Sequence, residues 1–158
     1  MSRVSLYLVV GVGLVIVAID QLAKLFALQL LEPGHSVPFI GDVIRLYLVR
    51  NDSAAFSIGN GQTWLFTIFS TIAAAALLWF GPRTKSKSWA LTAGLLLGGV
   101  VGNLIDRIIR EPGFPNGQVI DFIQIPFGFP IFNLADSAIV VAMSIVMIRI
   151  FRGHKIGQ

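Results

Sequence analysis

The 158-residue sequence has no cysteine, only two histidines and few charged residues. The absence of cysteine excludes disulfides, zinc–thiolate sites and thiol nucleophiles. Charged residues make up 13% of the chain, hydrophobic residues make up 55%, and the mean hydropathy is +0.80. This composition excludes an ordinary soluble domain and is typical of a membrane protein. The net charge of +4 does not indicate nucleic-acid binding, because no basic stripe alternates with exposed aromatic residues.

Four apolar segments are long enough, or nearly so, to cross a hydrocarbon core of about 30 Å as helices. We place these spans at residues 6–28, 63–80, 90–109 and 131–151. The first is longer than the apolar region of a typical cleaved signal sequence, so we interpret it as a retained helix.

The connections between spans predict a small β-containing platform on one face, at residues 32–60 and 111–130. Both connections are rich in proline and glycine, and the run VIRLYLV at 43–49 has the β-branched and aromatic residues of a strand. The predicted fold is therefore an all-α membrane protein with four transmembrane helices and an outer β platform. We expect residues 1–158 to form a single integral membrane domain.

The basic residues predict the orientation of the spans. Most of them flank one side of the predicted membrane region: Arg3, Arg83, Lys85, Lys87, Arg149, Arg152 and Lys155. By the positive-inside rule, both termini are expected in the cytoplasm. Four arginines on the opposite face, Arg45, Arg50, Arg107 and Arg110, make the bias moderate and need another explanation.

The acidic residues gather at one depth. Asp20 lies roughly 21 Å and Asp106 roughly 24 Å along helices that start at the cytoplasmic side, and Asp136 lies roughly 8 Å below the outer start of span four. Asp121 lies in the outer connection within VIDFI, where an ionised carboxylate is costly unless a partner stabilises it. All four carboxylates therefore reach the outer membrane layer.

Polar side chains are expected at the same depth: Lys24, Asn51, Asn103, Arg107 and Asn133. Ionisable groups inside a membrane are costly to insert, so they indicate a functional site. Structural interpretations stay open for individual residues. Asp20 and Lys24 could be a neutralising i,i+4 pair, and Asp106 and Arg107 could form ion pairs that hold span three to the platform. Asn133 could cap the last helix with Asp136 as its third residue.

The residue inventory limits the chemistry. His35 lies in a loop and His154 in the cytoplasmic tail, so serine–histidine catalysis and HExxH zinc hydrolysis are excluded. A serine–lysine pair of Lys24 with Ser53 or Ser137 has no supporting local spacing. Two carboxylates remain, which can share one proton so that one activates water while the other donates to a carbonyl oxygen. This scheme needs no metal or cofactor.

Five motifs follow one another along the spans: DQLAK at 20–24, RNDSAAF at 50–56, GNLIDR at 102–107, VIDF at 119–122 and FNLADS at 132–137. Together they resemble the lipoprotein signal peptidases, or signal peptidase II. The resemblance implies an aspartyl endopeptidase of the bacterial cytoplasmic membrane that cleaves signal peptides from diacylglyceryl-modified prolipoproteins. It also implies an outer β-cradle, contact with membrane lipids and inhibition by the cyclic peptide globomycin.

The resemblance assigns the catalytic pair to Asp121 and Asp136. It assigns a supporting polar shell to Asp20, Lys24, Asn51, Asn103, Asp106, Arg107 and Asn133. Many family members have glycine where this sequence has Ser53, and Asp52 adds a charge near the substrate path. We expect a monomer that binds no metal or nucleic acid.

Two other functions remain to be compared with the peptidase. A small proton- or ion-coupled transporter would use membrane carboxylates as a relay, but it predicts acids spread through the membrane and often repeated halves. A non-enzymatic assembly factor would use buried polar pairs only to fix helix packing, and it would tolerate isosteric loss of one acid.

Overall fold

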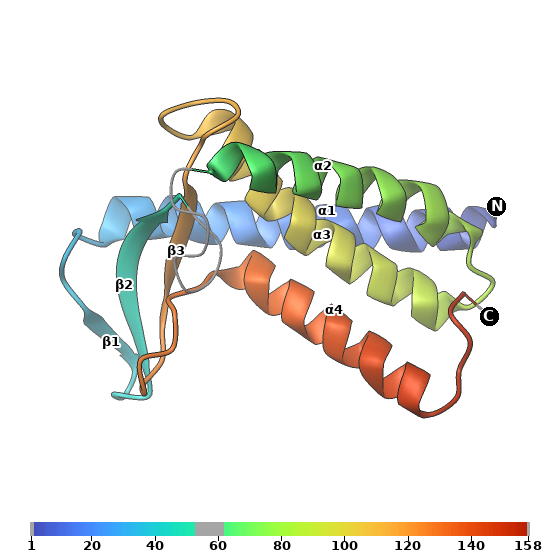
Figure 1. The fold of residues 1–158 in the computed structure, drawn as a ribbon. Helices are drawn as coiled ribbons and strands as arrows, with labels where there is room; N and C mark the ends of the chain where they lie inside the picture. The colour runs from blue at the N-terminus through green and yellow to red at the C-terminus, as the bar shows by residue number, and fades with distance from the viewer. Residues whose placement is uncertain (1, 53–61, 158) are drawn as a thin grey trace.

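The computed structural model describes residues 2–52 and 62–157 of the chain (Figure 1). Its long helices are α1 (Arg3–Leu30), α2 (Thr63–Phe80), α3 (Lys87–Ile109) and α4 (Leu134–Phe151), and a short 3₁₀-helix, η2 (Gly81–Arg83), follows α2. Its strands are β1 (Val37–Ile40), β2 (Ile44–Asn51) and β3 (Val119–Gln124). The four long helices are long and apolar enough to cross a membrane, which confirms the predicted number of spans.

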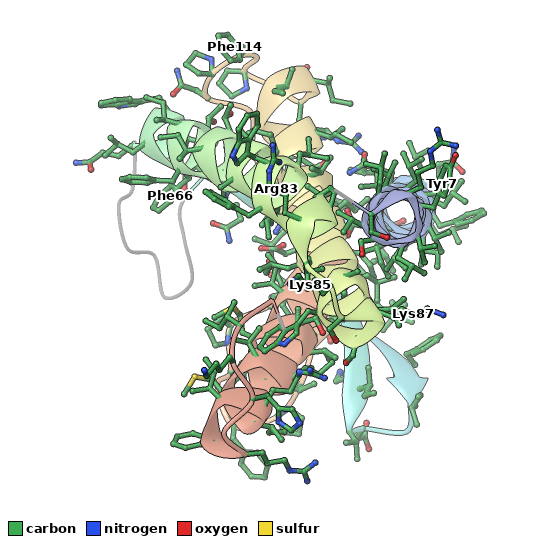
Figure 2. All side chains as sticks on the ribbon, turned by 90° about the vertical axis from the view of Figure 1, so that its right-hand side faces the viewer. Tyr7, Phe66, Arg83, Lys85, Lys87 and Phe114 are labelled. Carbon is green, nitrogen blue, oxygen red and sulfur yellow. The ribbon has the colours of Figure 1, made fainter. Side chains whose placement is uncertain are left out.

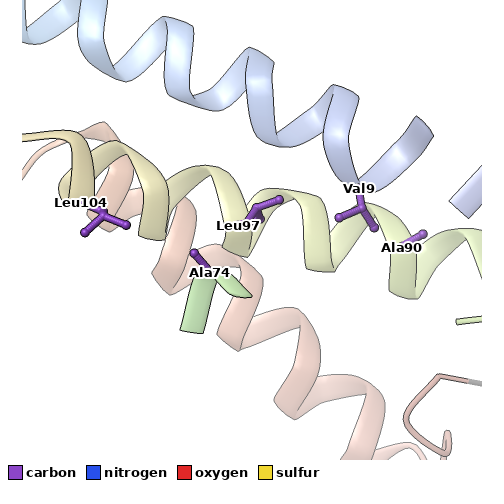
Figure 3. Close-up of a cluster of buried hydrophobic side chains, with 5 residues drawn as sticks. All are labelled: Val9, Ala74, Ala90, Leu97 and Leu104. Carbon is purple, nitrogen blue, oxygen red and sulfur yellow. The ribbon is translucent and has the colours of Figure 1, made fainter. Parts of the chain in front are cut away.

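Helix α3 forms the centre of the bundle and packs against the other three helices (Figure 1). More than half of its most apolar window is buried, at 56%, against 17% or less for the other helices. Most side chains of those three helices are therefore left to face lipid. A small apolar core joins α1, α2 and α3 through Val9, Ala74, Ala90, Leu97 and Leu104 (Figure 3).

Glycines bring α1 against α3. A Cβ added at Gly94 would lie 2.9 Å from Val12, and one at Gly98 would lie 2.5 Å from Ile16, both on α1. Contacts this short leave room only for hydrogen at these two positions. The glycines at four-residue intervals are thus a packing face, and this face aligns Asp20 on α1 with the C-terminal end of α3.

A three-stranded antiparallel sheet in the order β1-β2-β3 lies at the end of the bundle opposite the two termini (Figure 1). The predicted strand within VIRLYLV is confirmed, and β2 continues to Asn51. In the β2–β3 register, Asn51 is opposite Val119 and Val49 is opposite Asp121. The sheet therefore places Asn51 beside the strand that carries Asp121.

Helix boundaries differ from the predicted spans at three of the four starts. Helix α4 begins at Leu134 instead of 131, because Phe132 pairs with Ile123 of β3 and Asn133 caps the helix. Helices α1 and α3 begin three residues before the predicted spans, at Arg3 and Lys87, because polar residues at a membrane surface can continue a helix beyond its apolar part. Residues 53–60 of the predicted platform lie outside the described residues.

Candidate active site

Asp121 and Asp136 come from two elements that meet at the end of the bundle that carries the sheet. Asp121 is the third residue of β3 and is 2% exposed. Asp136 lies in the first turn of α4 and is half-buried. The two carboxylates interact electrostatically, since the charge of Asp136 contributes to the raised pKa of Asp121. The sheet and the last helix thus bring together two acids that are fifteen residues apart in the chain.

Two asparagines connect the acids. Asn103 Nδ2 donates to Asp136 Oδ1 at 2.7 Å, and Asn133 Nδ2 donates to Asp121 Oδ1 at 2.6 Å. Asn133 Nδ2 also lies 3.0 Å from Asn103 Oδ1. A continuous hydrogen-bonded chain therefore runs from one carboxylate to the other.

Asn133 also caps α4. Its Oδ1 accepts from the Asp136 amide at 2.9 Å, and Asp136 Oδ2 accepts from the Asn133 amide at 3.1 Å. This reciprocal pair is a capping box, with Asp136 in the role of the usual glutamate. The capping interpretation from the sequence is confirmed, and it leaves Asp136 Oδ1 directed to Asn103.

The second side-chain amide at Asp121 comes from the sheet. Asn51 Nδ2 donates to Asp121 Oδ2 at 2.8 Å, so each oxygen of this carboxyl group accepts a hydrogen bond from an asparagine. Burial and the charge of Asp136 raise the pKa of Asp121 to about 7, and the hydrogen bonds from Asn51 and Asn133 oppose this rise. A carboxyl group with this pKa can hold a proton near neutral pH.

A buried ionic cluster lies behind the pair. Lys24 Nζ is 2.8 Å from Asp20 Oδ2 and 2.7 Å from Asp106 Oδ2, and all three side chains are fully buried. Lys24 Nζ also donates to Asn103 Oδ1 at 3.0 Å. The interpretation of Asp20 and Lys24 as a neutralising ion pair is therefore correct. Lys24 also contacts Asn103, the asparagine that donates to Asp136.

The cluster joins elements that are distant in the sequence. Asp20 Oδ1 on α1 accepts from the Ala135 amide of α4 at 2.9 Å. Asp106 Oδ2 on α3 accepts from the Ile120 amide of β3 at 3.3 Å. These two contacts fix the residues next to Asp136 and Asp121, respectively.

Arg107 has a different environment from the one expected of an ion-paired residue. It is buried, it donates to the Asn103 carbonyl at 3.4 Å, and its guanidinium lies 5.8 Å from the Phe66 ring. Among the described residues it forms no ion pair within 4.0 Å, and Asp106 pairs instead with Lys24 and Arg110. The structural interpretation is therefore correct for Asp106, which forms ion pairs and accepts from the Ile120 amide of β3, and wrong for Arg107. The positive charge of Arg107 still acts on Asp136 and Asp121.

Two members of the cluster were not among the predicted site residues. Gln21 Nε2 lies 3.0 Å from the Gly102 carbonyl and 3.2 Å from Asp106 Oδ1, and Arg110 Nε lies 3.3 Å from the same oxygen. Gln21 stands within the DQLAK motif, and Arg110 follows Asp106 by four residues. Helical i,i+4 spacing could have indicated Arg110, whereas the rotamer of Gln21 depends on the packing of α1 on α3.

The serine–lysine alternative gains no support from the described residues. Lys24 Nζ already contacts three oxygen atoms, and Ser137 Oγ donates to the Asn133 carbonyl at 3.0 Å. Ser53 lies outside the described residues, as does most of the RNDSAAF motif. Within residues 2–52 and 62–157, no group of three or more histidines and acids is placed to hold a metal ion.

The family model of signal peptidase (SPase) II matches residues 12–152, which include all nine predicted site residues. The chain belongs to the signal peptidase II family. Membership of the signal peptidase II family makes the chain a membrane-embedded peptidase, and therefore a hydrolase.

Named relatives agree with the family assignment. The chain is 44% identical over 149 residues to the lipoprotein signal peptidase of Leifsonia xyli subsp. xyli. The aligned region covers 94% of this chain and 69% of that protein. It is 42% identical over 147 residues to the lipoprotein signal peptidase of Mycobacterium avium, and the aligned region covers 92% of this chain and 80% of that protein. The corresponding protein of Mycobacterium tuberculosis is also 42% identical, with coverage of 92% and 72%.

Solved structures support the fold. One bacterial membrane enzyme superposes with a TM-score of 0.79 at 28% identity, covering 89% of this chain and 85% of that chain. A second bacterial membrane enzyme has a TM-score of 0.75 at 28% identity, with coverage of 88% and 89%. The arrangement of four long helices with a small sheet at one end is therefore a known membrane-enzyme fold.

Proposed function

We propose that this chain is an aspartyl endopeptidase that removes the signal peptide from diacylglyceryl-modified prolipoproteins, with Asp121 and Asp136 as the catalytic pair. The observation that carries this proposal is the hydrogen-bonded chain from Asp121 through Asn133 and Asn103 to Asp136. The substrate class follows from the named relatives, which are lipoprotein signal peptidases.

The different environments of the two carboxyl groups suggest their roles. Asp121 is buried and has a pKa raised to about 7, so it holds the shared proton and acts as the general acid. Asp136 is less buried and interacts electrostatically with the positive charge of Arg107, so it is the general base. Two carboxyl groups with different environments are the usual arrangement for dividing these roles.

The reaction then proceeds in two steps. Asp136 takes a proton from water as the water oxygen attacks the scissile carbonyl carbon, and Asp121 gives its proton to the carbonyl oxygen to form a gem-diol. As the C–N bond breaks, Asp136 gives its proton to the leaving nitrogen and one hydroxyl returns a proton to Asp121. Both carboxyl groups recover their initial states, and no metal or cofactor takes part.

The surrounding residues would position the pair. Asn51, Asn103 and Asn133 orient the two carboxyl groups, and Arg107 supplies positive charge near the developing oxyanion. Asp20, Lys24 and Asp106 hold α1, α3, α4 and β3 in place around them. These side chains form the supporting shell in our proposal.

We place residues 1–158 in the bacterial cytoplasmic membrane as one monomeric peptidase domain, with both termini in the cytoplasm and the sheet outside. The basic residues at the end with the termini support this orientation. The chain contains no native cysteine, so a single introduced cysteine reports the side it occupies. A His35→Cys variant should react with an impermeant thiol reagent in intact cells, and Lys155→Cys only after permeabilisation; the reverse pattern would contradict the orientation.

A gel-shift assay tests the function. Purified protein should shorten a diacylglyceryl-modified prolipoprotein and leave the unmodified precursor uncut. Globomycin should stop the reaction, and a metal chelator should leave its rate unchanged. Equal cleavage of both precursors would contradict the substrate class, and loss of activity with the chelator would contradict the metal-free mechanism.

A further inference from the structure

The end of the molecule that carries both termini has an unbalanced charge. Seven basic residues lie in the helix ends and connections at this end: Arg3, Arg83, Lys85, Lys87, Arg149, Arg152 and Lys155. No aspartate or glutamate occurs in residues 1–19, 53–105 or 137–158, so no acidic residue neutralises them there. Figure 2 views the molecule from this end, where Arg83, Lys85 and Lys87 are labelled. This end therefore attracts anions.

Within it, Arg149 joins the last turn of α4 to the first turn of α3. Its guanidinium lies 4.5 Å from the centre of the Trp89 ring, and its Nη1 donates to Ser88 Oγ at 2.5 Å. The Trp89 side chain is buried, with 5% of the residue exposed. The guanidinium, the indole and the start of α3 thus form one compact group, which we name the Arg149–Trp89 site.

This site has hydrogen-bond donors without acceptors. Trp89 Nε1 and Arg149 Nε are both buried, and neither has a partner among the described residues. Most buried polar groups in proteins are hydrogen-bonded, so two adjacent orphan donors need an explanation. Both are donors only, and the atoms that would satisfy them are therefore acceptors.

The start of α3 adds backbone donors. Ser86 caps this helix by accepting from the Trp89 amide at 3.5 Å. The amides of Lys87 and Ser88, the first two residues of α3, have no carbonyl four residues earlier within the helix. Such a helix start favours anions such as phosphate. The exposed side chains of Lys87, the first residue of α3, and of Lys85, just before the cap, add positive charge there.

We propose that the Arg149–Trp89 site binds the phosphate of an anionic phospholipid headgroup. The site lies at the ends of two spans, which places it at the headgroup layer, and basic pockets between membrane helices are suited to such lipids. The lipid phosphate accepts from Arg149, from the indole N–H and from the first amides of α3. Because both orphan nitrogens are buried, the Arg149 side chain shifts on the ring when the lipid binds.

A second arginine–tryptophan pair at the same end provides a matched control. Arg83 lies 3.9 Å from the centre of the Trp79 ring and donates to the Trp79 carbonyl. Trp79 is 61% exposed, and neither member of this pair has a buried orphan donor among the described residues. Arg83→Gln therefore removes the same charge from the same face without altering the proposed site.

The test is native mass spectrometry of the purified full chain, released from micelles that contain equal amounts of phosphatidylglycerol and phosphatidylcholine. The wild type should retain phosphatidylglycerol preferentially. Arg149→Gln should lower the bound fraction at least about five-fold, the factor equivalent to roughly 1 kcal/mol per basic residue near an anionic surface. Trp89→Phe, which keeps an aromatic ring and removes only the indole N–H, should also lower it, whereas Arg83→Gln should retain most of the bound lipid.

Other results would overturn the proposal. Equal losses for Arg149→Gln and Arg83→Gln, with none for Trp89→Phe, would indicate diffuse attraction instead of a site. Displacement of the lipid by inorganic phosphate would indicate a site for free phosphate. If Arg149→Gln does not fold, Trp89→Phe alone tests the proposal. Its thermal unfolding in phosphatidylcholine shows whether it folds, and its retention of phosphatidylglycerol is then compared with that of the wild type.

Discussion

Asn133 donates a hydrogen bond to Asp121 across 2.6 Å while its other side-chain atom, Oδ1, caps the helix that carries Asp136. One amide side chain therefore positions both carboxyl groups. It also lowers the pKa of Asp121, against the larger effects of burial and of the Asp136 charge. This double role makes Asn133 a positioning residue whose loss should change both the helix cap and the titration of the pair.

Asn133→Ala should shift the alkaline limb of the cleavage pH profile to higher pH, because Asp121 loses a hydrogen bond that favours its ionised form. It should also cost about 1 kcal/mol of stability through the lost cap. Ser86→Ala is the matched control, since it removes the cap of α3 at the other end of the bundle. An unchanged pH profile in Asn133→Ala, with normal folding, would show that Asn133 does not act on Asp121.

Cleavage by the wild type should fall as pH rises through about 7, where Asp121 loses the proton that the mechanism requires.

The protonation of Asp121 also affects the stability of the folded chain. The pKa of Asp121 in the folded chain lies above the value of about 3.9 for an unfolded aspartate, so the folded state holds the extra proton between these values. The contribution of Asp121 to the free energy of unfolding should therefore fall as pH rises from about 4 to about 7.

Unfolding midpoints of the wild type and Asp121→Asn between about pH 4 and pH 7, and initial cleavage rates of the wild type on both sides of about pH 7, test that expectation. In Asp121→Asn, residue 121 should make no pH-dependent contribution to the free energy of unfolding. A rate that stays constant from pH 6 to pH 9, well beyond the expected transition near about 7, would contradict the role of Asp121 as the acid.

Lys24→Met should destabilise the protein by about 3–5 kcal/mol, because it leaves Asp20 and Asp106 buried without their shared cation. Lys85→Met, at an exposed position, should have little effect. Thermal unfolding of the two variants in the same detergent measures the difference. Equal midpoints would show that the buried cluster does not depend on the lysine.

Gly99→Ala should impair both folding and cleavage. A Cβ at this position would lie 2.5 Å from the Ala135 carbonyl and 2.7 Å from Ile139, so it would push the first turn of α4 away from α3. This displacement separates Asp136 from Asn103, at a typical overpacking cost of about 1–3 kcal/mol.

Gly11→Ala on α1 is the control, since its Cβ would meet nothing within 4 Å and alanine favours a helix. Unfolding midpoints and cleavage rates of the two variants can be compared directly. Normal cleavage by Gly99→Ala would mean that the close approach of α3 and α4 is not needed at the site.

The sequence predicted the parts of the structure that depend on hydrophobicity and depth. Long apolar runs are sufficient to predict four spans, and counting residues along them placed Asp20, Asp106 and Asp136 at one level. The sequence could not predict which donor meets which acceptor there. The contacts of Asn103, Asn133 and Gln21 depend on how α1, α3, α4 and β3 pack together, and similar spacings would be compatible with other pairings.

Two differences between the sequence prediction and the structure have separate causes. The sequence suggested ion pairs for both Asp106 and Arg107, but adjacent residues on a helix point in different directions, and only Asp106 forms them, with Lys24 and Arg110. The start of α4 was placed at 131 from hydropathy, but Phe132 pairs with the sheet and Asn133 ends the irregular segment. Hydropathy measures how apolar a segment is and does not locate its caps.

The most direct test of the proposed catalytic pair is the turnover of a diacylglyceryl-modified prolipoprotein by Asp121→Asn and Asp136→Asn, each purified as a folded membrane protein and compared with the wild type. Asparagine keeps the size and polarity of the side chain but can neither share a proton nor accept one from water. Each variant should bind the substrate and fail to cut it. Turnover near the wild-type rate in either variant would contradict the catalytic pair.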